Sequence, residues 1–152
     1  DGATYDIETS TRFIEVKSSI NREKREVTIS SQFQLFPNGK PLVLVLCCFE
    51  PTVMSGKSID SIISEFDSIG YNTALLNQKL EKKGFEAGMS ARKKNFILHE
   101  MLLYIIDDSF PTITPASFVG GVMPTGITKI NYTVDLSGLT PISLLQGENH
   151  DI

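Results

Sequence analysis

Alternating charged and apolar side chains near the start of the chain are the residues best suited to do chemistry. Residues 11–19 read TRFIEVKSS, and this alternation, with its β-branched and aromatic content, is typical of a strand. Because successive side chains on a strand point to opposite faces, Glu15 and Lys17 share the face of Phe13. A carboxylate and an ammonium group side by side on a core-forming strand need a physical explanation.

A second carboxylate is expected to face Glu15 from the preceding segment. If residues 9–12 form a four-residue hairpin loop, Asp6 lies directly across from Glu15. Two facing carboxylates repel each other by up to about 1 kcal/mol when solvated, and a divalent cation between them reverses the sign. Mg²⁺ is usually held by one or two carboxylates, and the backbone carbonyl of Val16 could add a third oxygen. Glu8 shares a face with Asp6 but lies nearer the loop, which makes it the weaker ligand.

The same residues have a plainer interpretation, a salt-bridged hairpin facing solvent that contributes little to stability. Alternation alone does not decide between this and a metal site. The metal site has a definite chemistry, because phosphodiester hydrolysis needs an activated water, charge relief on the phosphate and help for the leaving oxygen. One or two Mg²⁺ ions held by carboxylates meet all three needs.

An ordered set of segments resembles the PD-(D/E)XK nuclease superfamily, and one of its families in particular. That family consists of PD-(D/E)XK-motif proteins associated with bacterial restriction-type systems. The matching segments, which span most of the chain from about residue 3 to about 141, are Asp6, Glu15-Val16-Lys17, ISSQFQL at 29–35, DSFPTITPASF at 108–118 and YTVDL at 132–136. Tyr5 stands where the superfamily name has proline.

The resemblance implies an α/β fold with a restriction-endonuclease-like mixed β-sheet flanked by helices. We expect a single domain over residues 1–146 with a frayed tail at 147–152. Many superfamily members take a further acidic residue from a helix that precedes these strands. We therefore expect the chain to be the C-terminal part of a longer protein and to lack the N-terminal portion of the fold.

The resemblance also implies a Mg²⁺-dependent DNA endonuclease, with Mn²⁺ as a substitute, in a restriction or phage-defence system. Asp6, Glu15, Lys17 and Gln34 would be catalytic, and the metal would be held by Asp6, Glu15 and the carbonyl of Val16. Lys17 would orient the metal-bound water or stabilise developing negative charge. Gln34 would orient a water or a phosphate; the plainer interpretation is a hydrogen-bonding loop residue. The alternative function is a catalytically inactive nuclease-fold module for DNA binding or complex assembly.

Composition sets bounds on partners and location. The 152 residues carry a formal charge of −4, which argues against a histone-like binder but not against a nuclease with an acidic metal site. DNA is the expected partner, with other defence-system proteins and a homodimer left open, and Arg22, Lys24 and Arg25 are candidate backbone contacts. No apolar run approaches a membrane span. The two cysteines, adjacent at 47 and 48, read as reduced packing residues of a cytoplasmic protein.

The remaining elements follow from periodicity and turn signals. The expected elements are a hairpin of 11–19 with 26–30, a buried central strand at 42–49, helices starting at Ser58 and near 73, one long or bulged strand at 96–107, a helical turn at 114–118 and a last strand at 127–136. The length of 96–107 alone also permits a helix, but its β-branched and aromatic content favours the strand.

A nucleotide-binding loop is the competing motif for residues 42–58, where an apolar strand leads into Gly56-Lys57-Ser58 and a helix. A phosphate-cradling loop needs glycine where Pro51 stands, because the proline ring removes a backbone donor. Gly56 to Ser58 therefore reads as a turn and a helix cap.

Overall fold

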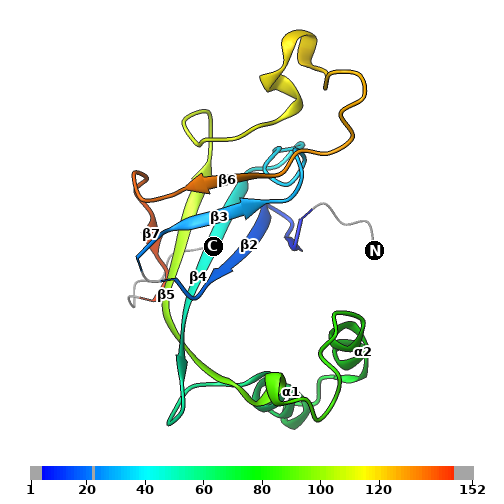
Figure 1. Cartoon of the computed structure of the whole chain (residues 1–152), viewed down its shortest axis with the longest axis vertical. Helices are drawn as coiled ribbons and strands as arrows, with labels where there is room; N and C mark the ends of the chain where they lie inside the picture. Colours follow the sequence, from blue (N-terminus) through cyan, green and yellow to red (C-terminus); the bar gives the residue numbers. More distant parts are fainter. Residues whose placement is uncertain (1–4, 22, 146–152) are drawn as a thin grey trace. The chain divides into compact units, whose positions relative to one another are not determined.

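The computed structural model describes residues 5–21 and 23–145 (Figure 1). Within that part the chain divides into two compact units. The sheet unit comprises Asp1–Cys48 and Glu100–Ile152, and the helical unit comprises Phe49–His99. The single domain expected over residues 1–146 stays a prediction. None of the described helices has the length and apolar character needed to cross a membrane.

A mixed five-stranded sheet is the larger element of the sheet unit. Its strands, in spatial order, are β1 (Ile7–Glu8), β2 (Phe13–Ser19), β4 (Leu42–Thr52), β5 (Asn95–Ile106) and β7 (Ile142–Ser143). β2 runs parallel to β4, whereas β1 is antiparallel to β2 and β7 is antiparallel to β5. The predicted long strand at 96–107 and the apolar central strand at 42–49 are both confirmed; the first is shifted by one residue and the second is extended by three.

A second, two-stranded sheet pairs β3 (Glu26–Ile29) with β6 (Tyr132–Asp135), antiparallel, with Val27 opposite Val134. The predicted hairpin of 11–19 with 26–30 is therefore wrong. Both edges of β2 are already occupied, by β1 and β4, so β3 finds its partner about a hundred residues later in the chain. The predicted last strand is correct only over Tyr132–Asp135, because residues 127–131 form no regular element.

The core lies on both faces of the larger sheet, as expected for a central strand that is apolar throughout. On one face, Leu42, Leu44 and Leu46 of β4 pack with residues of the two-stranded sheet, among them Ile29 and Val134. Figure 1 shows that two-stranded sheet lying across β2, β4 and β5. A smaller cluster around Ile14, Val43, Val45 and Leu103 occupies the other face.

The helical unit contains α1 (Ile59–Ser68) and α2 (Ala74–Lys82). Ser58 begins α1 with a reciprocal capping box to Ser61, so the cap predicted at Ser58 is confirmed and the nucleotide-loop interpretation is not needed. The 3₁₀ segments described are Ser90–Lys93, Pro115–Ser117 and Val119–Gly121. The fold is a mixed α/β fold, consistent with a restriction-endonuclease-like architecture, and the predicted class is confirmed.

Candidate active site

The β1–β2 hairpin sets the geometry of the candidate site. Ile7 pairs with Ile14 and Glu8 with Phe13, so the register continued by one residue places Asp6 across from Glu15. Residues 9–12 form the connecting loop, which Thr9 closes by accepting the amide of Arg12 at 3.0 Å through its hydroxyl. The expected four-residue loop and its register are therefore present.

Glu15 is a buried carboxylate, with 2 % of its surface exposed. It lies on the core-facing side of β2, beside Leu44 of β4, because it alternates in step with Phe13. Burial raises the pKa of its carboxyl group, the hydrogen bond and charge of Lys17 lower it, and the negative charge of Asp6 raises it. A carboxylate held in this environment gains from a nearby cation.

Lys17 supplies a cation to that carboxylate. Its Nζ lies 2.9 Å from Oε1 of Glu15, and 16 % of its side chain is exposed. The ion pair follows from the alternation of side chains along the strand, because residues two apart point to the same face and are neighbours there. The pair is therefore a largely buried ion pair rather than the solvent-facing one of the plainer interpretation.

Asp6 lies at the rim of the site. Its side chain is exposed, and its Oδ2 accepts the backbone N–H of Val16 at 2.8 Å. In an extended strand the N–H and C=O of one residue point to the same edge, so the Val16 carbonyl points toward the edge where Asp6 lies. The hairpin register therefore sets Asp6 opposite Glu15, and the Val16 carbonyl points to the same edge of β2 as Asp6.

Gln34 reaches the site from the loop after β3. Its Oε1 accepts the backbone N–H of Ser30 at 2.7 Å and the ammonium of Lys17 at 3.3 Å. The backbone N–H of Gln34 also donates to the Ser31 carbonyl at 3.2 Å, which fixes the turn. Gln34 is therefore both a loop hydrogen-bonding residue and a direct neighbour of Lys17.

The carboxylate oxygens of Asp6 and Glu15 and the carbonyl oxygen of Val16 suit a hard divalent cation. Carboxylate and carbonyl oxygens are what Mg²⁺ prefers, and two carboxylates are the number it commonly uses. Among residues 5–21 and 23–145, no group of three or more His, Cys, Asp or Glu side chains is placed to hold a metal. A cation here would complete its coordination with water, as Mg²⁺ usually does.

Two of the candidate DNA contacts, Lys24 and Arg25, fall outside this constellation. Nη2 of Arg25 donates to both carboxylate oxygens of Glu100, at 3.2 and 3.3 Å, so the charge of Arg25 is already engaged. Lys24 is exposed and lies 3.8 Å from Glu26. Arg22 lies outside the described residues.

Tyr5 and Lys40 brace the hairpin, and the sequence reasoning missed both. The ring of Tyr5 stacks on Phe13, and its hydroxyl donates to the carbonyl of Phe36. Lys40 pairs with Glu8 at 2.6 Å and also lies over the Phe13 ring, 5.2 Å from its centroid. Because Glu8 is ion-paired with Lys40, it is a weaker candidate for a metal ligand than Asp6 or Glu15. The turn signal at residues 37–41 located Lys40 in a loop but gave no indication of its partners.

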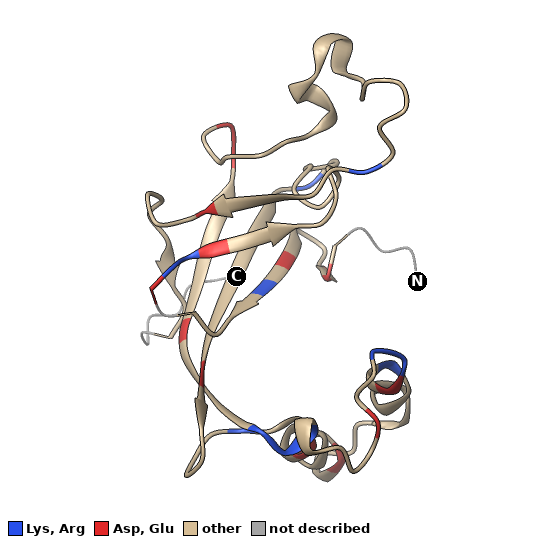
Figure 2. Ribbon diagram, viewed as in Figure 1, with Lys and Arg blue, Asp and Glu red and all other residues tan. Residues whose placement is uncertain are grey.

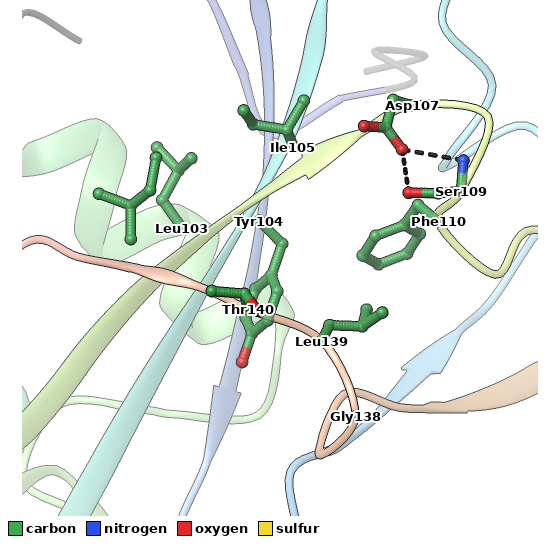
Figure 3. A pocket seen from close by; sticks show the side chains of 10 residues that line it. Leu103, Tyr104, Ile105, Asp107, Ser109, Phe110, Gly138, Leu139 and Thr140 are labelled. Carbon is green, nitrogen blue, oxygen red and sulfur yellow. Dashed lines mark hydrogen bonds between the residues drawn. The ribbon is translucent and has the colours of Figure 1, made fainter.

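A pocket of about 320 Å³ lies elsewhere in the sheet unit, between the end of β5 and residues 138–142 (Figure 3). At its rim Asp107 accepts the N–H and the hydroxyl of Ser109, at 2.9 and 2.6 Å, and these hydrogen bonds lower the pKa of Asp107. None of the four predicted catalytic residues lines it. It is therefore separate from the candidate site.

Comparison with protein-family models identifies a family for this chain. The model of a family described as "Putative PD-(D/E)XK family member, (DUF4420)" matches residues 1–137. The search of curated proteins found no significant match, and neither did the search of solved structures. The matched range includes every residue of the candidate site.

Proposed function

Because the chain belongs to the DUF4420 family of PD-(D/E)XK members, we propose that it is a metal-dependent nuclease that hydrolyses the phosphodiester bonds of DNA. The feature that supports the proposal is the register of the β1–β2 hairpin, which sets Asp6 opposite Glu15, together with the ion pair of Glu15 with Lys17. The resemblance to restriction-associated proteins supports a role in a restriction or phage-defence system.

In this proposal Asp6, Glu15 and the carbonyl of Val16 hold Mg²⁺, with Mn²⁺ as a substitute. The ion supplies a water of lowered pKa and relief of charge on the scissile phosphate. Glu15 would bind the ion from the core side, because its side chain is fixed in the core. Asp6 would bind the ion from the solvent side, because the backbone N–H of Val16 orients its carboxylate.

Lys17 is the residue that acts on the reacting groups. Its ammonium is held between Glu15 and Gln34, so it projects along the same face as the metal ligands. From there it orients the attacking water and stabilises the charge that develops on the phosphate oxygens. Gln34 is a positioning residue that holds Lys17 while its own oxygen is fixed by Ser30.

The test is nicking of supercoiled plasmid DNA by the full-length protein with Mg²⁺, with Mn²⁺ and with EDTA. Asp6→Asn and Lys17→Ala are compared with Glu8→Gln, a matched control because Glu8 is the neighbouring acid but is paired with Lys40. We expect metal-dependent nicking by the wild type and by Glu8→Gln, and a loss of about a hundredfold or more in the two site variants. DNA binding without nicking by all four proteins would overturn the nuclease and favour the inactive-module alternative.

A further inference from the structure

The two units carry opposite charge. The helical unit, Phe49–His99, contains seven Lys or Arg and six Asp or Glu, a net charge of +1. The rest of the chain contains seven basic and twelve acidic residues, a net charge of −5. A phosphate backbone is repelled by the unit that carries the candidate site, so affinity for DNA has to come from local cations.

Most described cations of the sheet unit are already neutralised. The pairs there are Lys17 with Glu15, Lys24 with Glu26, Arg25 with Glu100 and Lys40 with Glu8. Among its described residues, Arg12 and Lys129 are left outside ion pairs. Lys24, Arg25 and Lys40 are each near or paired with a glutamate, which weakens their attraction for a phosphate backbone, so outside the candidate site the sheet unit is a poor surface for DNA.

The helical unit offers five lysines that form no ion pair with any residue in the described part of the chain: Lys79, Lys82, Lys83, Lys93 and Lys94. All five are exposed. Lys57 and Arg92 differ, since they pair with Glu65 and Asp60. Figure 2 shows the basic residues of this unit gathered at the end of α2 and on the segment that leads into β5.

The first three lysines share one side of α2. Lys79 and Lys82 lie in the last turn of α2 and Lys83 is its C-cap residue; their spacing of i, i+3 and i+4 places them on one side of the end of the helix. Lysines in a last turn also stabilise the negative end of the helix dipole. That explanation does not extend to Lys93, the last residue of a four-residue 3₁₀ segment, or to Lys94, which follows that segment.

A buried arginine joins the two groups of lysines. Arg92 is 3 % exposed, donates through Nε to Asp60 of α1 at 2.7 Å and through Nη2 to Asn77 of α2 at 2.8 Å. It therefore fixes the segment carrying Lys93 and Lys94 against the helix that carries the other three. The five lysines are presented from one braced framework rather than from separate loops.

We propose that these five lysines form a surface that binds the phosphate backbone of duplex DNA, without reading its sequence. This deepens the proposed function, because the nuclease site lies in the acidic unit and the surface that holds its substrate lies in the other. Lys24 and Arg25, the cations first suggested by the sequence, contribute less because each is near or paired with a glutamate.

The test compares three double variants that each remove two positive charges. Lys82→Ala/Lys83→Ala and Lys93→Ala/Lys94→Ala change the surface, and Lys57→Ala/Lys129→Ala is the charge-matched control. Binding of a short fluorescein-labelled DNA duplex is measured by anisotropy over a salt series in EDTA, where a metal-dependent enzyme does not cut. Thermal melts of all the proteins establish that each is folded.

Each phosphate contact contributes about 0.9 to the slope of log K against log salt, so each surface variant is expected to lose about 1.8 from it. The control is expected to keep the wild-type slope. Equal losses of slope in all three variants would overturn the proposal, since net charge alone would then decide binding. An unchanged slope in both surface variants would also overturn it. The result is independent of the plasmid test: wild-type nicking with an unchanged slope rejects the surface alone, and a lost slope without nicking rejects the nuclease alone.

Discussion

The ring of Tyr5 stacks on the ring of Phe13, with centroids 4.2 Å apart and planes inclined by 22°. Tyr5 directly precedes Asp6, and Phe13 lies two residues before Glu15 on the same face of β2. The contact therefore ties together the two strands that carry the candidate metal ligands. The hydroxyl of Tyr5 adds a second tie through the carbonyl of Phe36.

Truncating Tyr5 should loosen the hairpin in two measurable steps. Tyr5→Phe keeps the stacked ring and loses the hydrogen bond, which costs about 1 kcal/mol. Tyr5→Ala also loses the ring contact and its buried area, for about 2 to 3 kcal/mol in total. Urea unfolding followed by circular dichroism measures both. Tyr71→Phe, at a residue 67 % exposed, is the control and should change stability by less than about 0.5 kcal/mol; equal costs for all three changes would contradict the bracing role.

The ion pair of Lys17 with Glu15 should show strong energetic coupling. Lys17→Met leaves the buried carboxylate of Glu15 without its cation, which costs about 2 kcal/mol after allowing for the part of Lys17 that is exposed. Adding Glu15→Gln removes the stranded charge, so the double variant should recover part of that loss. A double-mutant cycle in EDTA should give a coupling of about 1 to 2 kcal/mol. Additive effects would mean that the two side chains act independently.

Stability should depend on pH through Glu15. Because its pKa is raised in the folded protein, the folded state binds more protons than the unfolded state between the ordinary glutamate pKa and the raised value. The contribution of Glu15 is therefore complete below the ordinary pKa and is lost as the pH rises through the raised one. Unfolding measured across this window in EDTA should show that the wild type loses stability relative to Glu15→Gln as the pH rises. The opposite trend would mean that Lys17 outweighs burial.

Gly56 should be far less tolerant of substitution than Gly70. Both have positive φ, +87° and +84°, but a Cβ on Gly56 would clash with the Phe96 carbonyl oxygen, whereas nothing lies within 4 Å of one on Gly70. Gly70→Ala should cost about 1 kcal/mol of strain, and Gly56→Ala at least about 2 kcal/mol, because it also displaces the Lys57–Phe96 bridge. Hydrogen exchange of the Lys57 and Phe96 amides checks the local effect. Equal protection in the two variants would contradict it.

The sequence predicted the parts of the site that depend on local rules. Alternation placed Glu15 and Lys17 on one face, and the loop length set Asp6 opposite Glu15. It did not predict that β3 pairs with β6, because that choice depends on which edges other strands have already occupied. The contacts of Lys40 and Gln34 with the hairpin are also long-range, and the periodicity of the sequence does not predict them.

The most direct test of the central claim is Mg²⁺ binding measured by isothermal titration calorimetry without DNA. We predict one Mg²⁺ site in the wild type and in Glu8→Gln. The Mg²⁺ affinity of Asp6→Asn and of Glu15→Gln should be at least about tenfold weaker, since each removes one of two charged ligands. Unchanged Mg²⁺ affinity in Asp6→Asn and Glu15→Gln would contradict the claim that these two carboxylates share a cation.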